Sequence, residues 1–285
     1  MRRSMAATAL LLAAALTACA DSSDDGQPVD SARSTTPSPQ AAPAEPEPEP
    51  RTAAEFLARA EEAMAGPKGW TFAVKGREGL VLQGQENAAT YTATVRRTTG
   101  DPWALHSTGA TLSKGVSKPE EIYVADGTAY VKKGTAGWEH GPLTDPEFAD
   151  KVEDPLAALD AFRGYGAEVT LATPADRVEL RVRTATAPLP GVREEAVVKK
   201  ALRELAPTLR QLRAADVTTP ESGITVESVE ETLVLDPSTY RITAHTFECG
   251  FRIPYDGQSI RYEQEVTERT EGPYDGTVAR PDGIG

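Results

Sequence analysis

Residues 121–134 read EIYVADGTAYVKKG, and they carry the clearest short-range structural signal in this chain of 285 residues. Asp126-Gly127 lies between two runs of apolar and aromatic residues. An Asp-Gly pair in this position favours the positive backbone φ angles of a tight two-residue turn, so the stretch predicts a β-hairpin. A second Asp-Gly pair, at residues 256–257, predicts another hairpin between two strand-like runs.

Alternating apolar and polar residues predict further strands on both sides of these hairpins. Three segments instead carry apolar residues at helical spacing. The first follows a capping box at residues 52–55, the second begins at Asp154, and the third spans about 193–213, with a kink expected at Pro207. About eleven strands joined by short turns predict an α+β fold, in which helices cover one face of a curved antiparallel sheet.

The strand predicted at 240–252 contains an irregularity. Its apolar residues change from one face to the other between Ala244 and Phe247. Because the side chains of a regular strand alternate with a period of two, this change predicts a β-bulge or a strong local curl.

The N-terminus has the layout of a secretory signal peptide. A short basic head precedes an apolar run that is too short to span a bilayer, and Leu16-Thr17-Ala18-Cys19 follows it. This tetrapeptide resembles the lipobox of bacterial lipoproteins. The resemblance implies a diacylglycerol on the Cys19 thiol and cleavage just before that residue. The alternative is a soluble secreted protein, in which Cys19 is incidental or forms a disulfide with Cys249.

These features predict four regions along the chain. Residues 1–18 are the signal peptide, and residues 19–51 are the lipidated cysteine with a disordered stalk rich in proline and glutamate. Residues 52–270 form the folded domain, and residues 271–285 form a flexible tail. The stalk contains almost no large apolar residue, so it cannot bury enough surface to offset the entropy of the chain.

The composition narrows the choice of partners. The formal net charge is −13, and so acidic a chain is repelled by polyphosphate, which disfavours nucleic-acid binding. The acidity also argues against a basic patch for membrane contact. The expected partner is therefore a cell membrane, reached through the Cys19 lipid on the extracytoplasmic side. Cys249 is then left unpaired, and we expect it to be buried as a small apolar residue.

The sequence contains no motif typical of catalysis, cofactor binding or metal binding. His106, His140 and His245 are far apart and lack the spacing of metal ligands, so we expect ordinary sheet or loop histidines. Glu230 and Glu231 are neighbours in a predicted strand, so their side chains point to opposite faces and do not form a catalytic pair on their own. Carboxylates from different strands are still able to converge. We expect a protein without enzymatic activity, cofactor or metal.

Three stretches resemble one known group of proteins. They are 122–138 (IYVADGTAYVKKGTAGW), 154–162 (DPLAALDAF) and 229–248 (VEETLVLDPSTYRITAHTFE). Their content and order are similar to those of the LolA-like lipoprotein-carrier fold and of actinobacterial LppX/LprG-type lipoproteins. The resemblance implies an open half-barrel whose concave face is covered by helices. It also implies space between sheet and helices for the acyl chains of lipids, glycolipids or lipoproteins, and it implies no catalytic residue.

A pocket of this kind would be lined by the apolar faces of the first and third predicted helices. The candidate residues are Phe56, Leu57, Met64, Val198, Leu202, Leu205 and Leu209. The predicted function is a membrane-anchored lipoprotein that binds or carries a hydrophobic ligand. In the alternative, the helices pack directly on the sheet, and the domain is a surface interaction or sensory module with a filled core.

Cys19→Ala is expected to block acylation, because it removes the thiol that carries the lipid. Metabolic labelling with a fatty-acid analogue should give a labelled mature protein for the unsubstituted chain and no label for the variant. Cys249→Ala is the matched control and should be labelled normally. Label retained by the Cys19→Ala protein would contradict the lipidation.

Overall fold

The computed structural model describes residues 48–282 and residue 284. Cys19, the predicted signal peptide and most of the predicted stalk lie outside the described residues. In the part of the chain that is described, no helix has the length and apolar character needed to cross a membrane.

One antiparallel sheet contains the twelve strands of the described residues. Eleven strands lie side by side in the order β6-β5-β4-β3-β2-β1-β12-β11-β10-β8-β7, and β9 pairs with β10. Because the two ends of this order do not pair with each other, the sheet is open and not a closed barrel, as predicted. The strands are β1 (Gly69–Leu82), β2 (Gln85–Thr98), β3 (Leu105–Ser113), β4 (Val116–Ala125), β5 (Thr128–Lys133), β6 (Glu139–Pro142), β7 (Thr170–Ala172), β8 (Val178–Thr184), β9 (Ala187–Pro188), β10 (Thr225–Leu235), β11 (Ile242–Tyr255) and β12 (Gln258–Pro273).

Tight hairpins connect many neighbouring strands. At four of them both turn residues have a positive φ angle, which is the geometry of a type I′ turn and matches the twist of the flanking strands. Asp126-Gly127, with φ angles of 51° and 71°, joins β4 to β5, and Asp256-Gly257 joins β11 to β12. Both hairpins predicted from Asp-Gly pairs are therefore confirmed.

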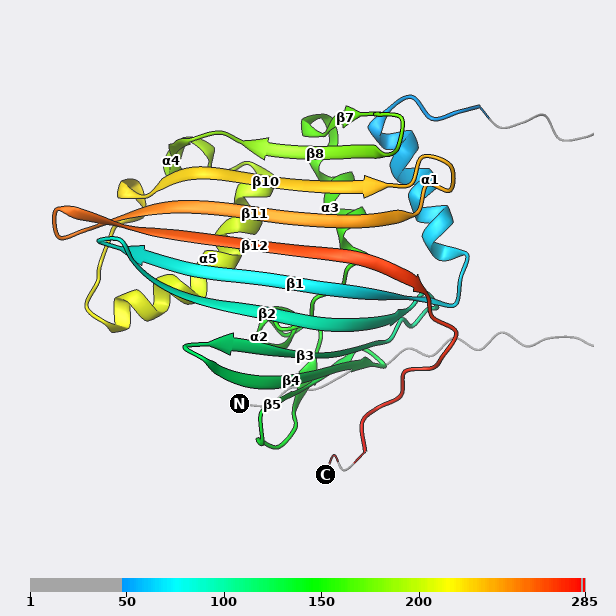
Figure 1. Cartoon of the computed structure of the whole chain (residues 1–285), viewed down its shortest axis with the longest axis horizontal. Coiled ribbons are helices and arrows are strands. Elements are labelled where there is room, and N and C mark those ends of the chain that lie inside the picture. Colours follow the sequence, from blue (N-terminus) through cyan, green and yellow to red (C-terminus); the bar gives the residue numbers. More distant parts are fainter. Residues whose placement is uncertain (1–47, 283, 285) are drawn as a thin grey trace, which may run out of the picture. The chain divides into compact units, whose positions relative to one another are not determined.

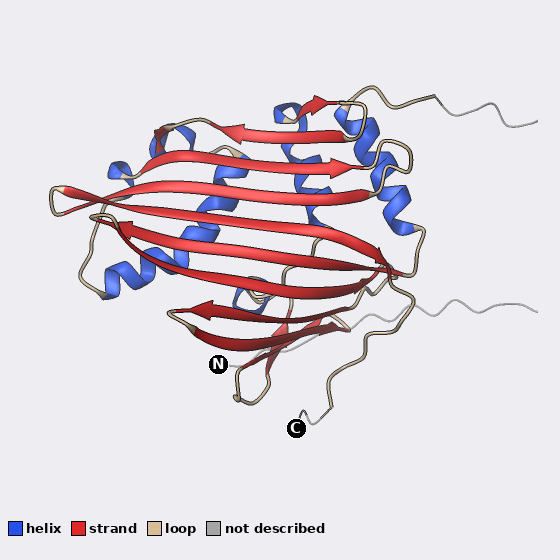
Figure 2. Ribbon diagram, in the orientation of Figure 1, coloured by secondary structure: helices blue, strands red, loops and turns tan. Residues whose placement is uncertain are grey.

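The helices lie on one face of the sheet, behind it in the view of Figures 1 and 2. They are α1 (Ala53–Ala65), α2 (Pro146–Ala149), α3 (Ala157–Tyr165), α4 (Leu189–Val192) and α5 (Ala196–Ala214), with 3-10 turns at Gly166–Glu168 and Glu221–Gly223. The predicted capping box is present at α1, where the Thr52 side chain accepts from the Glu55 amide and the Glu55 carboxylate accepts from the Thr52 amide. Asp154 precedes α3, accepts a hydrogen bond from the Leu156 amide, and pairs with Arg97 of β2.

The predicted irregularity in strand 240–252 is a bulge at Thr243. Leu235 of β10 pairs with Ile242, and Val234 pairs with Ala244, so Thr243 is an extra residue in β11. The bulge lies slightly earlier in the chain than predicted. As a result, His245 lies on the inner face of the sheet, where it is buried together with Phe247, Cys249 and Phe251 of the same strand.

The hydrophobic core lies between the inner face of the sheet and helices α1, α3 and α5. Trp70 of β1 is almost completely buried there, and its indole N–H donates to the carbonyl oxygen of Met64 at 2.6 Å. At the C-terminus, β12 continues to Pro273, so the fold extends past the predicted boundary at residue 270. In the predicted flexible tail, the Arg280 guanidinium lies over the ring of Tyr130, 5.6 Å from its centre.

Candidate functional site

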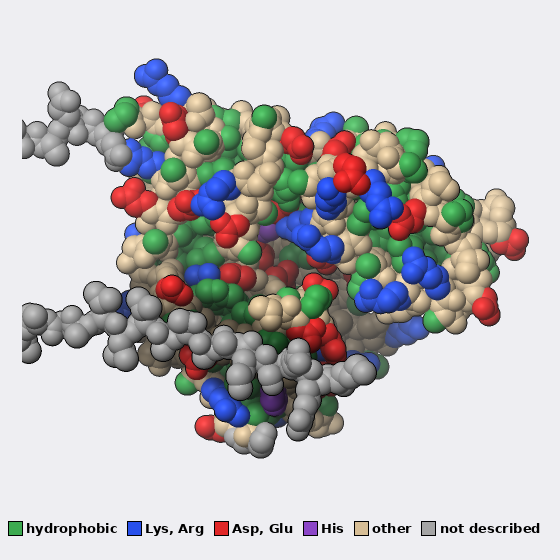
Figure 3. All heavy atoms as spheres, turned by 180° about the vertical axis from the view of Figure 1, so that it is seen from behind, with side chains coloured by type: hydrophobic (Ala, Val, Ile, Leu, Met, Phe, Trp, Pro, Cys, Tyr) green, Lys and Arg blue, Asp and Glu red, His purple; other side chains and the backbone are tan. Residues whose placement is uncertain are grey.

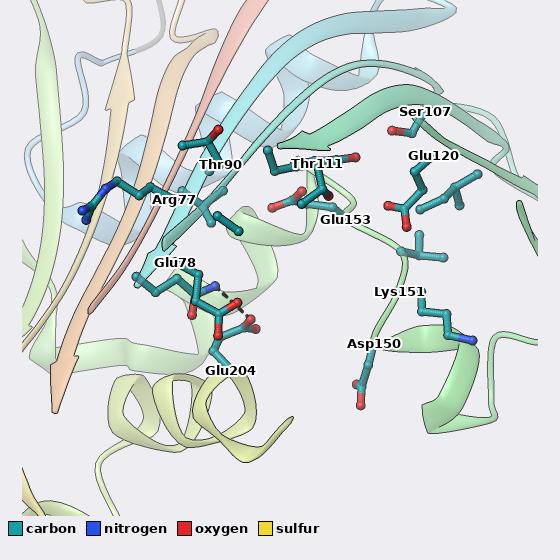
Figure 4. Close-up of a pocket in the computed structure, with 17 residues that line it drawn as sticks. Arg77, Glu78, Thr90, Ser107, Thr111, Glu120, Asp150, Lys151, Glu153 and Glu204 are labelled. Atoms are coloured by element: carbon teal, nitrogen blue, oxygen red, sulfur yellow. Dashed lines mark hydrogen bonds between the residues drawn. The ribbon is translucent and has the colours of Figure 1, made fainter. Parts of the chain in front are cut away.

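A cavity lies between the inner face of the sheet and the helices, on the side shown in Figure 3. It consists of two adjoining pockets of about 330 Å³ and about 590 Å³. The smaller pocket follows β1 to β4 (Figure 4), and the larger pocket lies between α3, α5, β11 and β12. Six residues line both pockets and mark their junction: Asp150, Val152, Glu153, Glu204, Gln264 and Val266.

The strands carry polar residues at inward positions where they pass the cavity. On β1, the buried residues Trp70, Phe72 and Val74 are followed at the same parity by Gly76 and Glu78, which line the smaller pocket. On β12 the inward residues Ile260 and Tyr262 are followed at the same parity by Gln264, Val266 and Glu268, which line the larger pocket. The cavity is therefore walled by a mixture of polar and apolar side chains.

A network of buried charged groups crosses β10, β11 and β12 beside the larger pocket. His245 pairs with Glu268 of β12, and its Nδ1 is 2.8 Å from Glu268 Oε2. The Nε2 of His245 is 2.7 Å from Glu231 Oε1 of β10. Glu231 is completely buried, and it also accepts from Lys200 Nζ at 2.7 Å and from the Tyr165 hydroxyl at 2.5 Å. The other four members line the larger pocket, so the network forms part of its wall.

His245 is positively charged in this arrangement, because only an imidazolium donates a hydrogen bond from each ring nitrogen. Burial by itself lowers the pKa of His245, but the hydrogen bonds to Glu231 and Glu268 outweigh burial and raise this pKa above its usual value. Burial by itself raises the pKa of Glu231, but the His245 hydrogen bond and the charge of Lys200 bring it down to about 2. Two cations thus balance two carboxylates, which is the usual condition for burying charge.

The network is not arranged for acid–base catalysis or metal binding. Both ring nitrogens of His245 are engaged by carboxylates, so neither is free to take a proton from a substrate. The two nitrogens face separate carboxylates, and no group of three or more His, Cys, Asp or Glu side chains in the described chain has the arrangement of a metal site. What the network does is hold the carboxylate of Glu268 and the ammonium group of Lys200 in the cavity wall.

Glu153 lies between α2 and α3 and lines both pockets. Its carboxyl group forms no hydrogen bond or ion pair with another described residue. Burial raises the pKa of Glu153 to about 8, and the negative charges of Glu268 and Glu204 act in the same direction. Burial and these two charges therefore favour the neutral form of the half-buried Glu153 side chain.

The residues predicted to line a pocket lie in or against the core. Phe56, Leu57, Met64, Val198 and Leu205 are buried in the hydrophobic cluster, and Leu202 and Leu209 are partly buried against it. None of these seven residues belongs to the linings of the two pockets described above. Helix α5 instead presents Lys200, Arg203 and Glu204 to the larger pocket. For the apolar stripe of this helix, the structure agrees with the alternative of direct packing on the sheet.

The charged network was not predicted from the sequence, although the pattern of β10 and β12 contains a sign of it. Glu231 has the same parity as Val229 and Leu233, and Glu268 has the same parity as the inward-facing Tyr262. A charged residue at an inward position of a strand needs a partner, and this requirement points to His245. His245 lies in a strand, as expected of a sheet histidine, but its burial between two carboxylates was not predicted.

Cys249 is free and buried on β11, close to the larger pocket but outside its lining. Burial raises the pKa of its thiol well above the usual value. The thiol is therefore protonated and unreactive at neutral pH, and the prediction of a buried, apolar cysteine is confirmed.

The fold and the cavity define a class of structure: an open, curved antiparallel sheet with helices and a mixed polar cavity on its inner face. No protein-family model matches the chain, and no curated protein matches its sequence. Among solved structures, the chain is similar to LprF from Mycobacterium bovis, with 15% identity and a TM-score of 0.33 over 80% of this chain and 96% of LprF.

Two other solved structures are similar over a comparable length. Rv2717c from M. tuberculosis has 12% identity and a TM-score of 0.23, over 75% of this chain and 98% of that protein. A DUF1329 family protein from Desulfovibrio piger has 6% identity and a TM-score of 0.27, over 76% of this chain and 91% of that protein. At these identities the similarity concerns the fold alone and transfers no function.

Glu153→Gln is expected to stabilise the domain at alkaline pH. The pKa of Glu153 is about 8 in the folded protein, against an ordinary value of 4.5. Below pH 4.5 this acid is protonated in both the folded and the unfolded state and does not affect stability. As the pH rises from 4.5 toward 8, it increasingly destabilises the folded state, because only the unfolded state ionises freely. Thermal unfolding should show equal midpoints for variant and wild type near about pH 4.5, and a higher midpoint for the variant near about pH 8.5. The exposed Glu265→Gln is the control and should show no such divergence. A lower midpoint for Glu153→Gln at the alkaline pH would contradict this assignment.

Proposed function

We propose that the chain is a membrane-anchored, extracytoplasmic lipoprotein that binds a lipid in the cavity between sheet and helices. The observation that carries this proposal is the cavity itself, in which a pocket of about 590 Å³ adjoins one of about 330 Å³. Sites for small ligands typically measure roughly 300–1,000 Å³. The space is therefore large enough for part of a lipid.

The cavity walls favour an amphipathic ligand over a purely apolar one. Phe247 and Val266 offer apolar surface from the sheet, and Ala158 and Ala161 offer it from α3. An alkyl chain bound against these residues gains about 0.8 kcal/mol for each methylene group removed from water. The polar side chains of the same walls offer hydrogen bonds to the head group of such a ligand.

The charged network supports binding in a second way, because it holds the cavity wall in place before a ligand arrives. Its hydrogen bonds join three adjacent strands to α3 through Tyr165 and to α5 through Lys200. A site that is already formed loses less conformational entropy when it binds.

The resemblance of Leu16-Thr17-Ala18-Cys19 to a lipobox supports the proposed location. The acidic, proline-rich segment after Cys19 is well suited to hold a domain away from a membrane surface, since such segments favour extended conformations. In this proposal the membrane is a partner through the lipid on Cys19, and the cavity takes a separate lipid molecule.

We propose binding without catalysis. The histidine beside the cavity has both ring nitrogens engaged, and the nearby Cys249 thiol is buried with a raised pKa. Neither group is therefore prepared to act as a base or a nucleophile.

A surface interaction module is the second candidate function. At the β3–β4 hairpin, Leu112 and Val116 leave 48% and 57% of their surface exposed. Exposed apolar side chains at the end of a hairpin favour contact with another protein. The patch is small, so we rank this function below lipid binding.

Val266→Trp is expected to reduce ligand uptake. Val266 lines both pockets, so a larger side chain at this position fills space that the ligand would occupy. Uptake of a 12-carbon chain carrying an environment-sensitive fluorophore should fall at least about tenfold, while the unfolding midpoint changes little because the new side chain enters open volume.

Glu265→Trp is the matched control, because the neighbouring residue of the same strand is exposed on the opposite face. It should take up the probe as the wild type does. A wild-type domain that takes up no probe, or a Val266→Trp domain that binds normally, would overturn the proposed function.

A further inference from the structure

The outer face of the sheet, opposite the helices (Figure 1), carries a row of aromatic rings on β3 to β6. Residues that pair directly across antiparallel strands lie on the same face. The tight Asp126-Gly127 turn sets Tyr123 opposite Tyr130. Their strand neighbours, such as Val124 and Ala129, point into the core, so this row points away from it. The whole row, in strand order, is His106, Tyr123, Tyr130 and His140.

The rings of this row contact one another and a tryptophan. His106 and Tyr123 stack, with ring centres 4.1 Å apart and planes that differ by 12°. Trp138, which precedes β6, meets the Tyr123 ring at 67°, with 5.6 Å between the ring centres. Aromatic rings on an outward face add nothing to the core behind the sheet. Such a cluster is therefore a candidate binding surface.

The C-terminal segment after β12 makes this cluster one wall of a pocket. Residues 277–282 form the other wall, and the space between them measures about 530 Å³, a size typical of sites for small ligands. Arg280 of this segment lies over the Tyr130 ring, and Tyr130 is buried although it lies on the outer face. None of the residues that line this pocket lines either pocket of the inner face, so the two sites are separate.

Charged side chains in this pocket have hydrogen-bonding capacity that the described chain does not use. The register places Glu121 opposite Lys132, but the two form no ion pair. Glu121 uses only Oε1, which accepts from the Tyr123 hydroxyl at 3.0 Å and lies 3.1 Å from His106 Nε2. The ammonium group of Lys132 lies 5.6 Å from the centre of the Trp138 ring and pairs with no carboxylate of the described residues.

The charges around the pocket balance one another. Arg280 and Asp282 line it from the C-terminal segment, and neither forms an ion pair with another described residue. With Lys132 and Glu121 from the sheet, the pocket has two cationic and two anionic side chains beside His106. Balanced charges favour neither an anion nor a cation at long range, but at short range they supply both donors and acceptors of hydrogen bonds.

We propose that this outer pocket binds a saccharide chain. A sugar ring has a face of C–H groups, which packs favourably on aromatic rings because their faces carry partial negative charge. Its hydroxyl groups both donate and accept hydrogen bonds, as the charged side chains of the pocket require. A neutral sugar also carries no net charge, in agreement with the balance of the pocket. This site is additional to the lipid cavity and does not rest on the proposed function.

The test follows the indole N–H signals of the tryptophans by NMR while sugars are added to the purified protein. The probes are maltotriose, cellotriose and mannotriose, and at least one of them should shift the Trp138 signal in a saturable manner. Trp70 is the internal reference, since its indole donates to the Met64 carbonyl inside the core, and its signal should not move. Sorbitol, a polyol without a sugar ring, and triglycine, a zwitterion, should leave the Trp138 signal unchanged.

Two variants locate the sugar, with binding measured by saturation-transfer NMR of the sugar signals. Trp138→Ala should weaken binding at least about tenfold, and because Trp138 lies outside the core cluster, the unfolding midpoint should change little. Lys132→Gln should weaken binding at least about fivefold. Lys133→Gln is the matched control, because it makes the same change in charge on the opposite face of β5 and should bind as the wild type does.

Val266→Trp, which fills the lipid cavity, should also bind the sugar normally, so failure of this inference and failure of the proposed function are distinguishable. The inference is wrong if none of the sugars moves the Trp138 signal, or if sorbitol or triglycine moves it as strongly. Sugar binding that is unchanged in both Trp138→Ala and Lys132→Gln would place the sugar elsewhere. Octyl maltoside, kept below its micelle concentration, should act no more strongly than maltotriose. A much stronger shift of Trp138 with octyl maltoside would show a site for a lipid-linked sugar and contradict a saccharide chain.

Discussion

The placement of His245 between Glu231 and Glu268 is the interaction on which the inner face of the sheet depends. The three residues lie on adjacent strands, and the two ring nitrogens of His245 donate to Glu231 at 2.7 Å and to Glu268 at 2.8 Å. Two carboxylates on one buried face would repel each other. The imidazolium of His245 lies between them and attracts both, which offsets this repulsion. Removing one partner of a buried charged network typically costs about 3–5 kcal/mol, because the remaining charges stay buried without compensation.

This network also explains how one inner face serves both as a core and as a cavity wall. Glu231 is fully buried and is held by Tyr165 from α3 and Lys200 from α5, so the network fastens two helices to the sheet. On the other side, His245 and Glu268 reach the larger pocket. A polar cavity thus lies next to a close-packed core, and the network belongs to both. In the proposed function, this cavity receives the lipid.

Much of the fold was predictable because it depends on local patterns. The Asp-Gly turns, the capping box at Thr52 and the strand alternation each act over a few residues, and each signal agrees with the structure. The bulge at Thr243 was predicted only approximately, because a change of parity shows that a residue is inserted but not which one. Its small displacement mattered, since it decides whether Ala244 or His245 faces inward.

The site was far less predictable than the fold. An apolar stripe on a helix looks the same whether it faces a core or a cavity, and in α5 the stripe around Leu205 faces the core. Glu153 and Glu204 lie in a connection and on the polar side of a helix, positions where acids are ordinarily solvated. Only the three-dimensional arrangement brings them to the same space as Glu78. The pairing of Glu231 and Glu268 likewise depends on the order of β10, β11 and β12, which the sequence pattern alone does not give.

The most direct test of this account is the protonation state of His245. Nitrogen-15 NMR of the ring-labelled domain, recorded at about pH 7.5, reports each imidazole nitrogen separately, and an unperturbed histidine is mostly neutral at that pH. We expect both nitrogens of His245 to be protonated and to show the shifts of an imidazolium. A neutral ring with one unprotonated nitrogen would contradict the charged network, and with it the account of how the core and the cavity share one face of the sheet.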